Sequence, residues 1–502
     1  MAKKMKKRLA TLLLALALAA QLIACGGENP DTPETSGDQS SETTSEAASD
    51  ELTDSLPKDL KFDGETINIL YRGREDIADY DLIGQENSGD IVYDAVYERN
   101  LAVMERFGVE FEFTAAPKSI GDAMPYFKTA VLSGADGIDL IWATGNTLVV
   151  SGLNSAFRDF SESEYLDFEK PWWNLPAMRE ISLDGKTINY LYGNLMLIGL
   201  RQTGLMYFNK NIYTDLYGDP DKLYETVLDG NWTLDEFAKL CKGVYQDLNG
   251  NSKADEDDDR FAAVFSTSIE ENLTHFVYST DFTTYKRGND NLPVIDMTSD
   301  RSVTIATRFC ELFKASDPDY SFSTHSFSDT KLYENFAAGH YLFFPERFYA
   351  ATLPTLRDMK DEYGMIPYPK FDENQKEYRN LIHNSGTVAA APIALSDERF
   401  EMVCAVLEAM AAKQQTTVLP TFYEVALKTK YSRDDLSSQV IDLVYNCSTK
   451  DLVSEYGSLT KHIYAIVAKC VQKGLPFAST YASEITAANA ELQKLGGDII
   501  GK

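Results

Sequence analysis

In the first part of the chain, hydrophobic residues recur with two different spacings, one after the other along the sequence. Apolar side chains alternate or form short runs at some positions, which is typical of strands, and recur every three or four residues at others, which is typical of helices. The pattern predicts strands at residues 66–71, 109–113 and 138–143, and helices at residues 93–107 and just before Gly134. This strand–helix order favours a parallel sheet covered by helices, so the expected fold class is α/β.

The residues at the carboxyl ends of these strands are candidates for ligand binding. Ligands of open α/β sheets collect at the carboxyl ends of the strands. The first strand ends at Tyr71 and Arg72, and the third ends near Trp142, with Asn146 shortly after it. For Trp142 the alternative is simple packing in the core of the sheet.

The N-terminus carries a short apolar segment behind a basic head. Five positive charges lie between residues 3 and 8, and an apolar stretch runs from residue 9 to residue 20. Such a segment is too short to span a bilayer as a helix of the mature protein, and it is typical of a secretory signal. We therefore expect residues 1–24 to be a signal peptide.

The residues before Cys25 resemble the cleavage site of bacterial lipoprotein signals. The resemblance implies a mature chain that starts at Cys25 and carries acylated glycerol, with chains such as palmitate, on the cysteine thiol. Residues 26–57 contain nine acidic residues and no aromatic residue, Lys or Arg. Such a segment cannot bury enough apolar surface to fold, so residues 25–58 are expected to form an extended acidic linker. The alternative is an ordinary signal with a chance cysteine.

The charge and the cysteine spacing argue against several classes of protein. The formal net charge is −30, and removal of the signal takes away five further positive charges. This balance argues against nucleic acid as a partner and against docking on anionic lipid through a basic patch. The five cysteines that follow Cys25 show no CxxC spacing, which favours free thiols over disulfides.

Six short segments occur in the order used by bacterial extracellular solute-binding proteins. They lie at residues 95–100, 137–142, 207–210, 231–237, 336–339 and 364–369. No single segment is diagnostic, but six in order behind a lipoprotein-like signal carry the resemblance. The chain resembles the receptors of ABC importers, in the broad family 1 group that contains maltose-binding protein.

The resemblance implies a two-lobed, periplasmic-binding-protein-like fold of type II, with hinge strands and C-terminal helices. Residues 59–200 and 366–397 would form the first α/β lobe, residues 201–365 the second, and residues 398–502 helices that pack mainly on the second lobe. The chain would cross between the lobes near residues 198–202 and return near residues 364–369. A strand at residues 387–393 would then belong to the first lobe again.

The resemblance also implies ligand-binding residues in both lobes. They are Tyr71, Arg72, Trp142 and Asn146 of the first lobe, and Tyr207, Glu346 and Arg347 of the second. Trp172 and Trp173 could stack on a sugar or pin a loop to the lobe, and both options stay open. For Glu346 and Arg347 the alternative is a surface ion pair. Trp232 precedes a capping-box pattern, which indicates a structural role instead.

Residues 247–258 have the ligand spacing of an EF-hand loop. In such a loop, side-chain oxygens stand at positions one, three, five, nine and twelve, and position seven offers its backbone carbonyl. These positions are Asp247, Asn249, Asn251, Asp255 and Asp258, with Lys253 at position seven. Position six is Ser252 instead of glycine, and residues 260–265 look like a strand instead of an exit helix. Similar calcium loops occur here in the resembling family, so a structural calcium is expected, with a solvated acidic turn as the alternative.

Motifs of catalysis are missing from the sequence. It contains no HExxH, GxSxG, P-loop or glycine-rich dinucleotide pattern, and its five histidines are scattered. We therefore expect no enzyme and no catalytic cofactor, but a monomeric binding protein held by lipid on the extracellular face of the cell membrane. On the resemblance, it would deliver a solute, an oligosaccharide with a peptide as the alternative, to the permease subunits of an ABC transporter. The alternatives are a secreted glycan hydrolase that uses a carboxylate pair, and a surface glycan adhesin or sensor.

Overall fold

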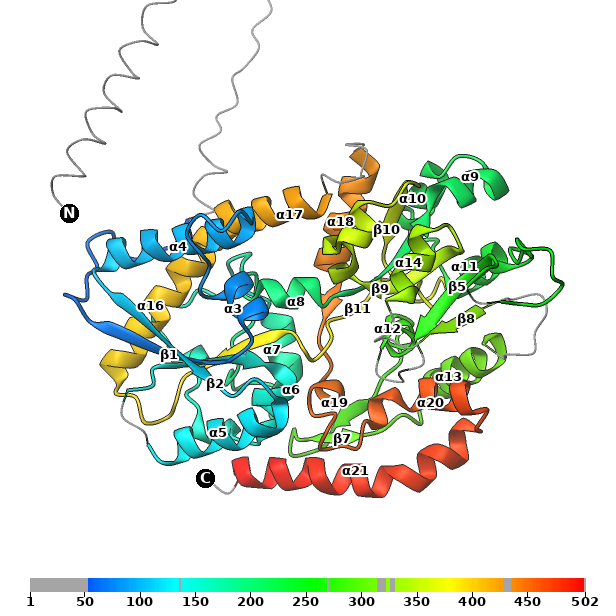
Figure 1. The fold of residues 1–502 in the computed structure, drawn as a ribbon. Coiled ribbons are helices and arrows are strands. Elements are labelled where there is room, and N and C mark those ends of the chain that lie inside the picture. The colour runs from blue at the N-terminus through cyan, green and yellow to red at the C-terminus, as the bar shows by residue number, and fades with distance from the viewer. Residues whose placement is uncertain are drawn as a thin grey trace, which may run out of the picture. The chain divides into compact units, whose positions relative to one another are not determined.

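The computed structural model describes residues 53–500, apart from residues 135–136, 256, 267, 269–270, 314–321, 326–329 and 428–434. The signal peptide, Cys25 and all but the last residues of the expected linker lie outside the described residues. The described part contains two large sheets (Figure 1). We call each sheet with its flanking helices a lobe. No helix among the described residues is both long and apolar enough to cross a membrane.

The sheet of the first lobe has four strands in the order β12-β3-β1-β2. They are β1 (Thr66–Arg72), β2 (Glu110–Ala116), β3 (Leu140–Thr144) and β12 (Thr387–Ala390). β1 is parallel to both β2 and β3, which confirms the parallel sheet expected from the strand–helix order. β12 is antiparallel to β3, so the chain does return to the first sheet at residue 387.

Helix α4 (Ile91–Phe107) shows how the sequence sets the ends of an element in this lobe. The Asp90 side chain accepts hydrogen bonds from the N–H groups of Val92 and Tyr93, which caps the first turn. Gly108 ends the helix with a φ of 69°, a left-handed conformation that glycine adopts without strain. Between these ends, the buried face of α4 packs into the core.

The sheet of the second lobe has five strands in the order β10-β4-β9-β5-β8. They are β4 (Gly204–Asn209), β5 (Phe261–Ser266), β8 (Phe322–His325), β9 (Tyr341–Arg347) and β10 (Tyr363–Ile366). β5 confirms the strand expected after the acidic loop. β9 is parallel to β5 and antiparallel to β4, so Arg347 at the end of β9 lies opposite Gly204 at the start of β4.

Two short strand pairs complete the sheets. β6 (Tyr285–Arg287) pairs with β7 (Pro293–Ile295), and β11 (Asn380–Leu381) pairs with β13 (Ser448–Thr449).

Two of the segments that connect the lobes lie beside each other. Helix α8 (Leu197–Arg201) leads into β4, at the place where the sequence predicts the first crossing. The expected return near residues 364–369 begins only after β10, which still pairs in the second sheet, and it passes through residues 382–386 before β12. Thr203 on the first segment and Ile382 on the second form a β-bridge. Both segments attach where β3 and β9 have their carboxyl ends.

Asp81, at the end of α3 (Glu75–Asp81), ties the first crossing segment to the first sheet. Its buried carboxylate accepts hydrogen bonds from the backbone N–H of Ile198 (2.6 Å), the indole of Trp142 (3.4 Å) and the hydroxyl of Thr387. These three partners belong to α8, β3 and β12. Burial raises the pKa of Asp81 to about 6, although the hydrogen bonds act in the opposite direction.

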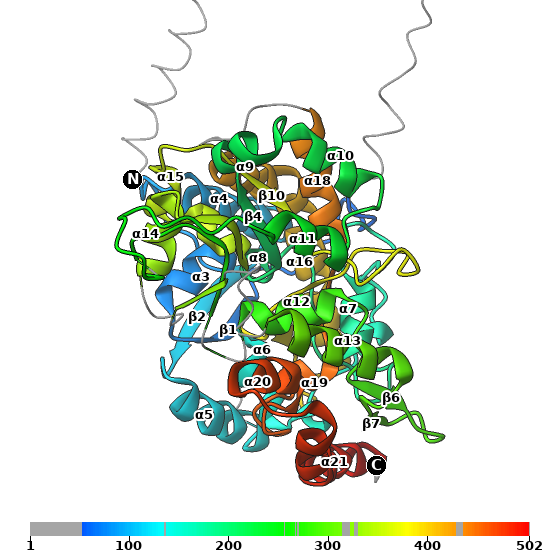
Figure 2. The ribbon, with the colours of Figure 1, turned by 90° about the vertical axis from the view of Figure 1, so that its right-hand side faces the viewer.

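Further helices flank both sheets (Figure 2). Those of the first lobe are α5 (Ile120–Leu132), α6 (Gly145–Leu148) and α7 (Leu175–Ile181). Those of the second lobe are α9 (Lys210–Tyr217), α10 (Asp221–Leu228), α11 (Leu234–Cys241), α12 (Asn272–Ser279), α13 (Asp300–Leu312), α14 (Lys331–Ala337) and α15 (Pro354–Arg357).

Trp232 and Thr233 begin α11 in the way that the capping pattern predicts. The Thr233 hydroxyl accepts a hydrogen bond from the N–H of Glu236 (3.3 Å). The indole of Trp232 is fully buried and donates to the carbonyl of Pro367 (3.0 Å). The structural role expected of Trp232 is therefore confirmed.

The C-terminal helices are shared between the two lobes. They are α16 (Asp397–Lys413), α17 (Leu419–Leu427), α18 (Asp435–Asn446), α19 (Leu452–Glu455), α20 (Ile466–Lys473) and α21 (Phe477–Ile500). α16 and α17 pack along α4 of the first lobe, as Figure 1 shows. α18 packs on α10 and β10, and α20 packs on α12 and α13 of the second lobe. The sequence places these helices mainly on the second lobe, but α16 is buried on nearly all sides and fills the first.

Candidate ligand-binding site

Arg72 and Asn146 meet at the carboxyl ends of β1 and β3. The Arg72 guanidinium donates from Nη1 to the Thr144 hydroxyl (2.9 Å) and from Nε to the carbonyl of Lys118 (2.9 Å). The Thr144 hydroxyl donates in turn to Oδ1 of Asn146 (2.8 Å). Arg72 and Asn146 are only half-buried, and burial lowers the pKa of Arg72 below its usual value. The Nη2 group of Arg72 forms no hydrogen bond within the described part of the chain.

Glu346 and Arg347 form a buried pair at the end of β9, not a surface ion pair. Arg347 contacts Glu346 through Nε (3.0 Å) and Glu271 through Nη2 (3.4 Å), and the side chain of Arg347 is 7 % exposed. Its Nη1 donates to Oε1 of Gln202 on the first crossing segment (2.9 Å). Burial alone would lower the pKa of Arg347, but the two carboxylates raise it. All three nitrogens of this guanidinium therefore have partners.

Backbone contacts join these two groups of residues across the crossing segments. The N–H of Asn146 donates to the carbonyl of Asn384 (2.7 Å), and the N–H of His383 donates to the carbonyl of Gln202 (3.0 Å). Gln202 holds Arg347, as described above. We call the set Arg72, Thr144, Asn146, Gln202, Glu271, Glu346 and Arg347 the strand-end cluster. It contains residues of both lobes.

Two histidines that the sequence gives no reason to select lie beside this cluster. The rings of His275 on α12 and His383 on the return segment have centroids 5.6 Å apart. Burial lowers the pKa of His275 to about 3 and that of His383 well below its usual value, and the charge of Arg347 acts in the same direction. Both imidazoles are therefore neutral near pH 7. A Cβ at Gly204 would lie 2.6 Å from Nδ1 of His275, so the start of β4 accepts no side chain.

Arg201 and two tyrosines also lie near the crossing segments. The sequence analysis selects none of the three. The guanidinium carbon of Arg201 lies 4.1 Å from the ring centroid of Tyr80 and 5.0 Å from that of Tyr349. These contacts connect α8 with α3 and with the turn after β9. Of the features that the sequence predicts, the crossing near residues 198–202 falls on this region.

Several aromatic residues selected from the sequence are packed inside the lobes. Trp142 is 2 % exposed, and Trp172 and Tyr207 are fully buried. The Tyr207 hydroxyl accepts from the N–H of Ala351 (3.0 Å) and supports the turn that follows Arg347. Tyr71 is half-buried and lies beside Trp142 in the sheet. Stacking on a ligand needs an exposed ring face, so in this arrangement these side chains build the core around the site.

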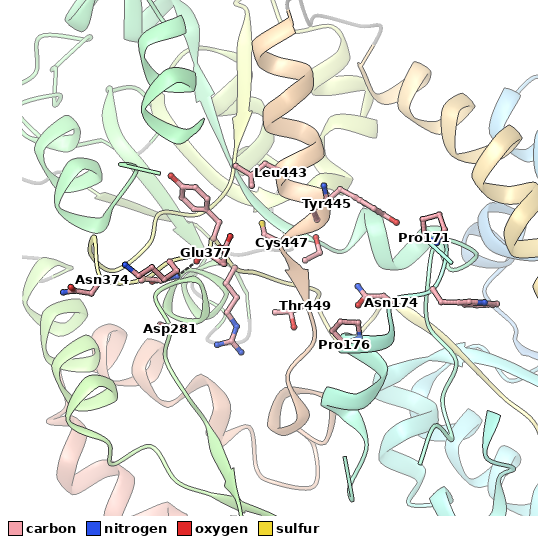
Figure 3. Close-up of a pocket in the computed structure, with 17 residues that line it drawn as sticks. Pro171, Asn174, Pro176, Asp281, Asn374, Glu377, Leu443, Tyr445, Cys447 and Thr449 are labelled. Carbon is pink, nitrogen blue, oxygen red and sulfur yellow. Dashed lines mark hydrogen bonds between the residues drawn. The ribbon is translucent and has the colours of Figure 1, made fainter. Parts of the chain in front are cut away.

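A groove of about 770 Å³ lies between the lobes (Figure 3). Its lining comes mainly from three stretches that are far apart in the sequence, at residues 171–176, 374–379 and 443–449, together with Asp281. Trp172, within the first stretch, does not line it. Trp173 is the only residue selected from the sequence that lines it. A small cavity of about 20 Å³ adjoins it and is lined by Asn174, Thr203, Ile382 and Ser448.

The acidic loop brings the side chains expected to bind calcium together. The two oxygens of Asp247 accept from the N–H groups of Gly250 (2.6 Å) and Ser252 (2.8 Å). Ser252 has a φ of 61°, so position six adopts the left-handed turn for which the motif prefers glycine. Asn249 and Asn251 both donate to Asp255, and the carbonyl of Lys253 accepts from Tyr245. The Asp247 oxygens are thus occupied by backbone N–H groups, and Asp255 receives the amides of both asparagines.

Asp258, at position twelve, departs from this arrangement. It is exposed, whereas Asp259 is buried and accepts from the N–H groups of Leu248 and Asp255. Among the described residues, no three His, Cys, Asp or Glu side chains are arranged around a common metal position.

Solved structures with the same arrangement of lobes are known. A cyclo/maltodextrin-binding protein in complex with maltotetraose has a TM-score of 0.53 at 12 % identity, over 86 % of this chain and 98 % of that one. UgpB from Mycobacterium tuberculosis in complex with glycerophosphocholine has a TM-score of 0.52 at 14 % identity, over 87 % and 100 %. An ABC transporter solute-binding protein from Thermotoga lettingae, bound with α-D-tagatose, has a TM-score of 0.50 at 13 % identity, over 86 % and 100 %.

This chain has the two-lobed fold of the ABC transporter solute-binding proteins. No family model and no curated protein sequence matches it. At these identities the likeness describes the fold, and residue roles have to come from the contacts of this chain.

One contact in this solute-binding fold connects the interlobe groove to a titratable group. Glu408 on α16 is 1 % exposed and accepts hydrogen bonds from the indoles of Trp172 (3.2 Å) and Trp173 (2.7 Å). Burial raises the pKa of Glu408 to about 7, although the two indole hydrogen bonds lower it. The charge state of Glu408 thus acts on Trp173, which lines the groove.

We expect the tryptophan signal and the stability of the protein to depend on Glu408. Between the ordinary pKa of 4.5 and the folded value of about 7, the folded state holds a proton that the unfolded state has lost. Stability from this group is therefore greatest below pH 4.5 and falls as the pH rises toward 7. Tryptophan fluorescence should change with a midpoint near pH 7, because two of the four tryptophans contact Glu408.

The test compares fluorescence titrations and urea unfolding at pH 5 and pH 8. Glu408→Gln should abolish the fluorescence transition and reduce the difference in stability between the two pH values. Glu398→Gln, an exposed change on the same helix, serves as the control and should behave like the wild type. The same transition in Glu408→Gln would contradict the assignment.

Proposed function

We propose that this protein binds a small solute, an oligosaccharide, at the strand-end cluster and delivers it to an ABC transporter permease. The observation that carries the proposal is the placement of Arg72 and Arg347 at the carboxyl ends of strands in different lobes, joined by both crossing segments. A ligand that contacts both lobes stabilises one arrangement of them, which links binding to lobe closure.

The chemistry of the cluster supports a polyhydroxylated ligand. Guanidinium, amide and carboxylate groups are planar and can fix sugar hydroxyls in defined directions. Within the cluster, Arg347 is saturated by Glu346, Glu271 and Gln202, whereas Arg72 retains Nη2. Arg72 is therefore the residue best able to contact a ligand, with Asn146 beside it. Maltotetraose and tagatose in two similarly folded proteins support the same ligand class.

A binding role accounts for the two buried carboxylates better than hydrolysis does. A glycoside hydrolase needs two carboxyl groups that flank the scissile bond. Glu346 and Glu271 instead both contact the guanidinium of Arg347, so their oxygens are committed to positioning it. The proposed protein is accordingly a monomeric receptor without catalytic activity.

The proposed place of action is the extracellular face of the cell membrane. There the lipid on Cys25 would hold the protein, and the acidic linker up to residue 58 would let the lobes reach the permease. Calcium in the loop of residues 247–258 would be structural, since the loop belongs to the segment before β5 and outside the strand-end cluster.

We expect Arg72→Ala to weaken saccharide binding at least tenfold, about 1.4 kcal/mol. The variant loses a half-buried guanidinium whose Nη2 group is available to donate to a ligand. Calorimetry with a panel of maltotetraose, cellotetraose, xylotetraose and mannotetraose measures the effect. Arg74→Ala, two residues away and paired only with exposed Asp76, is the matched control and should retain affinity. Unchanged affinity in a folded Arg72→Ala protein would refute the site.

We expect calcium to raise the thermal midpoint and a chelator to lower it. A ligand that binds only the folded state stabilises it by about 2.7 kcal/mol at a hundredfold excess over its dissociation constant. In Asp247→Ala the difference between calcium and chelator should vanish, whereas in Asp215→Ala, an exposed change on α9, it should persist. Identical melting curves of the wild type in both conditions would favour the solvated turn.

We expect Cys25→Ser to move the protein from the membrane fraction to the soluble fraction. The cysteine is the proposed lipid attachment point, and no helix in the described part of the chain can span a bilayer. Fractionation of cells that express each form, followed by a thermal melt, tests this. Tight membrane association of a folded Cys25→Ser protein would show that another anchor exists.

A further inference from the structure

The interlobe groove has walls from both lobes and from the C-terminal region. Asn174 and Pro176 lie at α7 of the first lobe, Asn374 and Glu377 follow β10, and Tyr445 ends α18 (Figure 3). A volume of about 770 Å³ falls within the range of sites for small molecules. Any occupant of the groove would touch segments whose relative position depends on the lobes.

Fixed aromatic rings face this groove. Trp173 is 6 % exposed and is held by Glu408 through its indole N–H. The Tyr378 hydroxyl donates to the carbonyl of Val227 (2.9 Å) and accepts from the N–H of Trp232 (3.2 Å), so the orientation of its ring is set from behind. Rings whose polar atoms are already satisfied offer apolar surface without the entropy cost of ordering them.

The polar groups of the groove have capacity left for a ligand. Asn174 uses Oδ1 to cap α7, and its Nδ2 has no hydrogen bond among the described residues. Arg379 forms no ion pair there either, and its guanidinium lies 5.9 Å from the ring of Tyr278. The charged lining residues are Lys376, Arg379, Asp281 and Glu377, two of each sign.

We propose that the groove is a second binding site, for a neutral saccharide. Because the lining charges cancel, a ligand with net charge gains little from them. A sugar hydroxyl can both donate and accept, so it can use the guanidinium, the carboxylates and the free amide together. The apolar face of a sugar ring can lie on half-buried Tyr445, beside the narrow exposed edges of Trp173 and Tyr378. This site is additional to the strand-end cluster, and its ligand class was argued from its own lining.

The two sites are separate sets of residues that both adjoin the crossing segments. They share no residue, and the bridge between Thr203 and Ile382, with the small cavity beside it, adjoins the groove. Each site has residues of both lobes, so ligands at the two sites are coupled through the arrangement of the lobes.

Calorimetry of the full chain with maltotetraose, cellotetraose, xylotetraose and mannotetraose tests the second site. At least one of these should bind with two equivalents per protein. Arg379→Ala and Glu377→Ala should each weaken one equivalent at least tenfold, and Arg72→Ala should weaken the other. Glu373→Ala is the matched control, because it is exposed in the same loop but does not line the groove.

Each other outcome decides against one site or both. One equivalent that only Arg72→Ala removes overturns the groove site and leaves the proposed function intact. One equivalent that only the groove variants remove confirms the groove and overturns the strand-end site. Two equivalents that survive both groove variants in folded protein overturn the groove site, and absence of binding by all four sugars overturns both assignments.

Discussion

The burial of the Asp81 carboxylate is the constraint on which the connection between the lobes depends. Its three donors come from α8, β3 and β12, so the first crossing segment and two strands are fixed to one side chain. Arg99 is buried beside it, but donates to the carbonyls of Asp81 and Leu82 and to Gln414. A buried carboxylate is stable only while its partners stay in place. Movement of α8 against the first sheet therefore has to break directional hydrogen bonds.

The same two crossing segments adjoin both proposed binding regions, the strand-end cluster and the groove. The segments fixed by Asp81 and by the Thr203–Ile382 bridge carry Gln202 of the strand-end cluster and His383 beside it, and they line the small cavity that adjoins the groove. A change in the position of the lobes alters both regions together. Linkage between the two proposed ligands would follow from the position of the lobes and would require no further contact path.

The sequence predicts what depends on local pattern. The strands of the first sheet, the capping of α11 at Thr233 and the first crossing near residue 200 follow from periodicity and from the order of short segments. The sequence does not distinguish a buried aromatic ring from an exposed one. Trp142, which is buried, would fit the same strand pattern if its ring faced a ligand. Glu408 lies 236 positions from Trp172, and the groove is assembled from three distant stretches. Such contacts exist only once the chain has folded.

The two arginines of the strand-end cluster show why position alone does not identify a ligand contact. Both stand at the ends of strands, and the sequence selects them for the same reason. Arg347 is surrounded by two carboxylates and an amide, so its desolvation is balanced inside the protein and its removal would leave Glu346 buried without a partner. Arg72 bonds only to hydroxyl and carbonyl oxygens and keeps one nitrogen unused. Arg347 thus holds neighbouring side chains in place, whereas Arg72 keeps the hydrogen-bonding capacity on which the proposed binding rests.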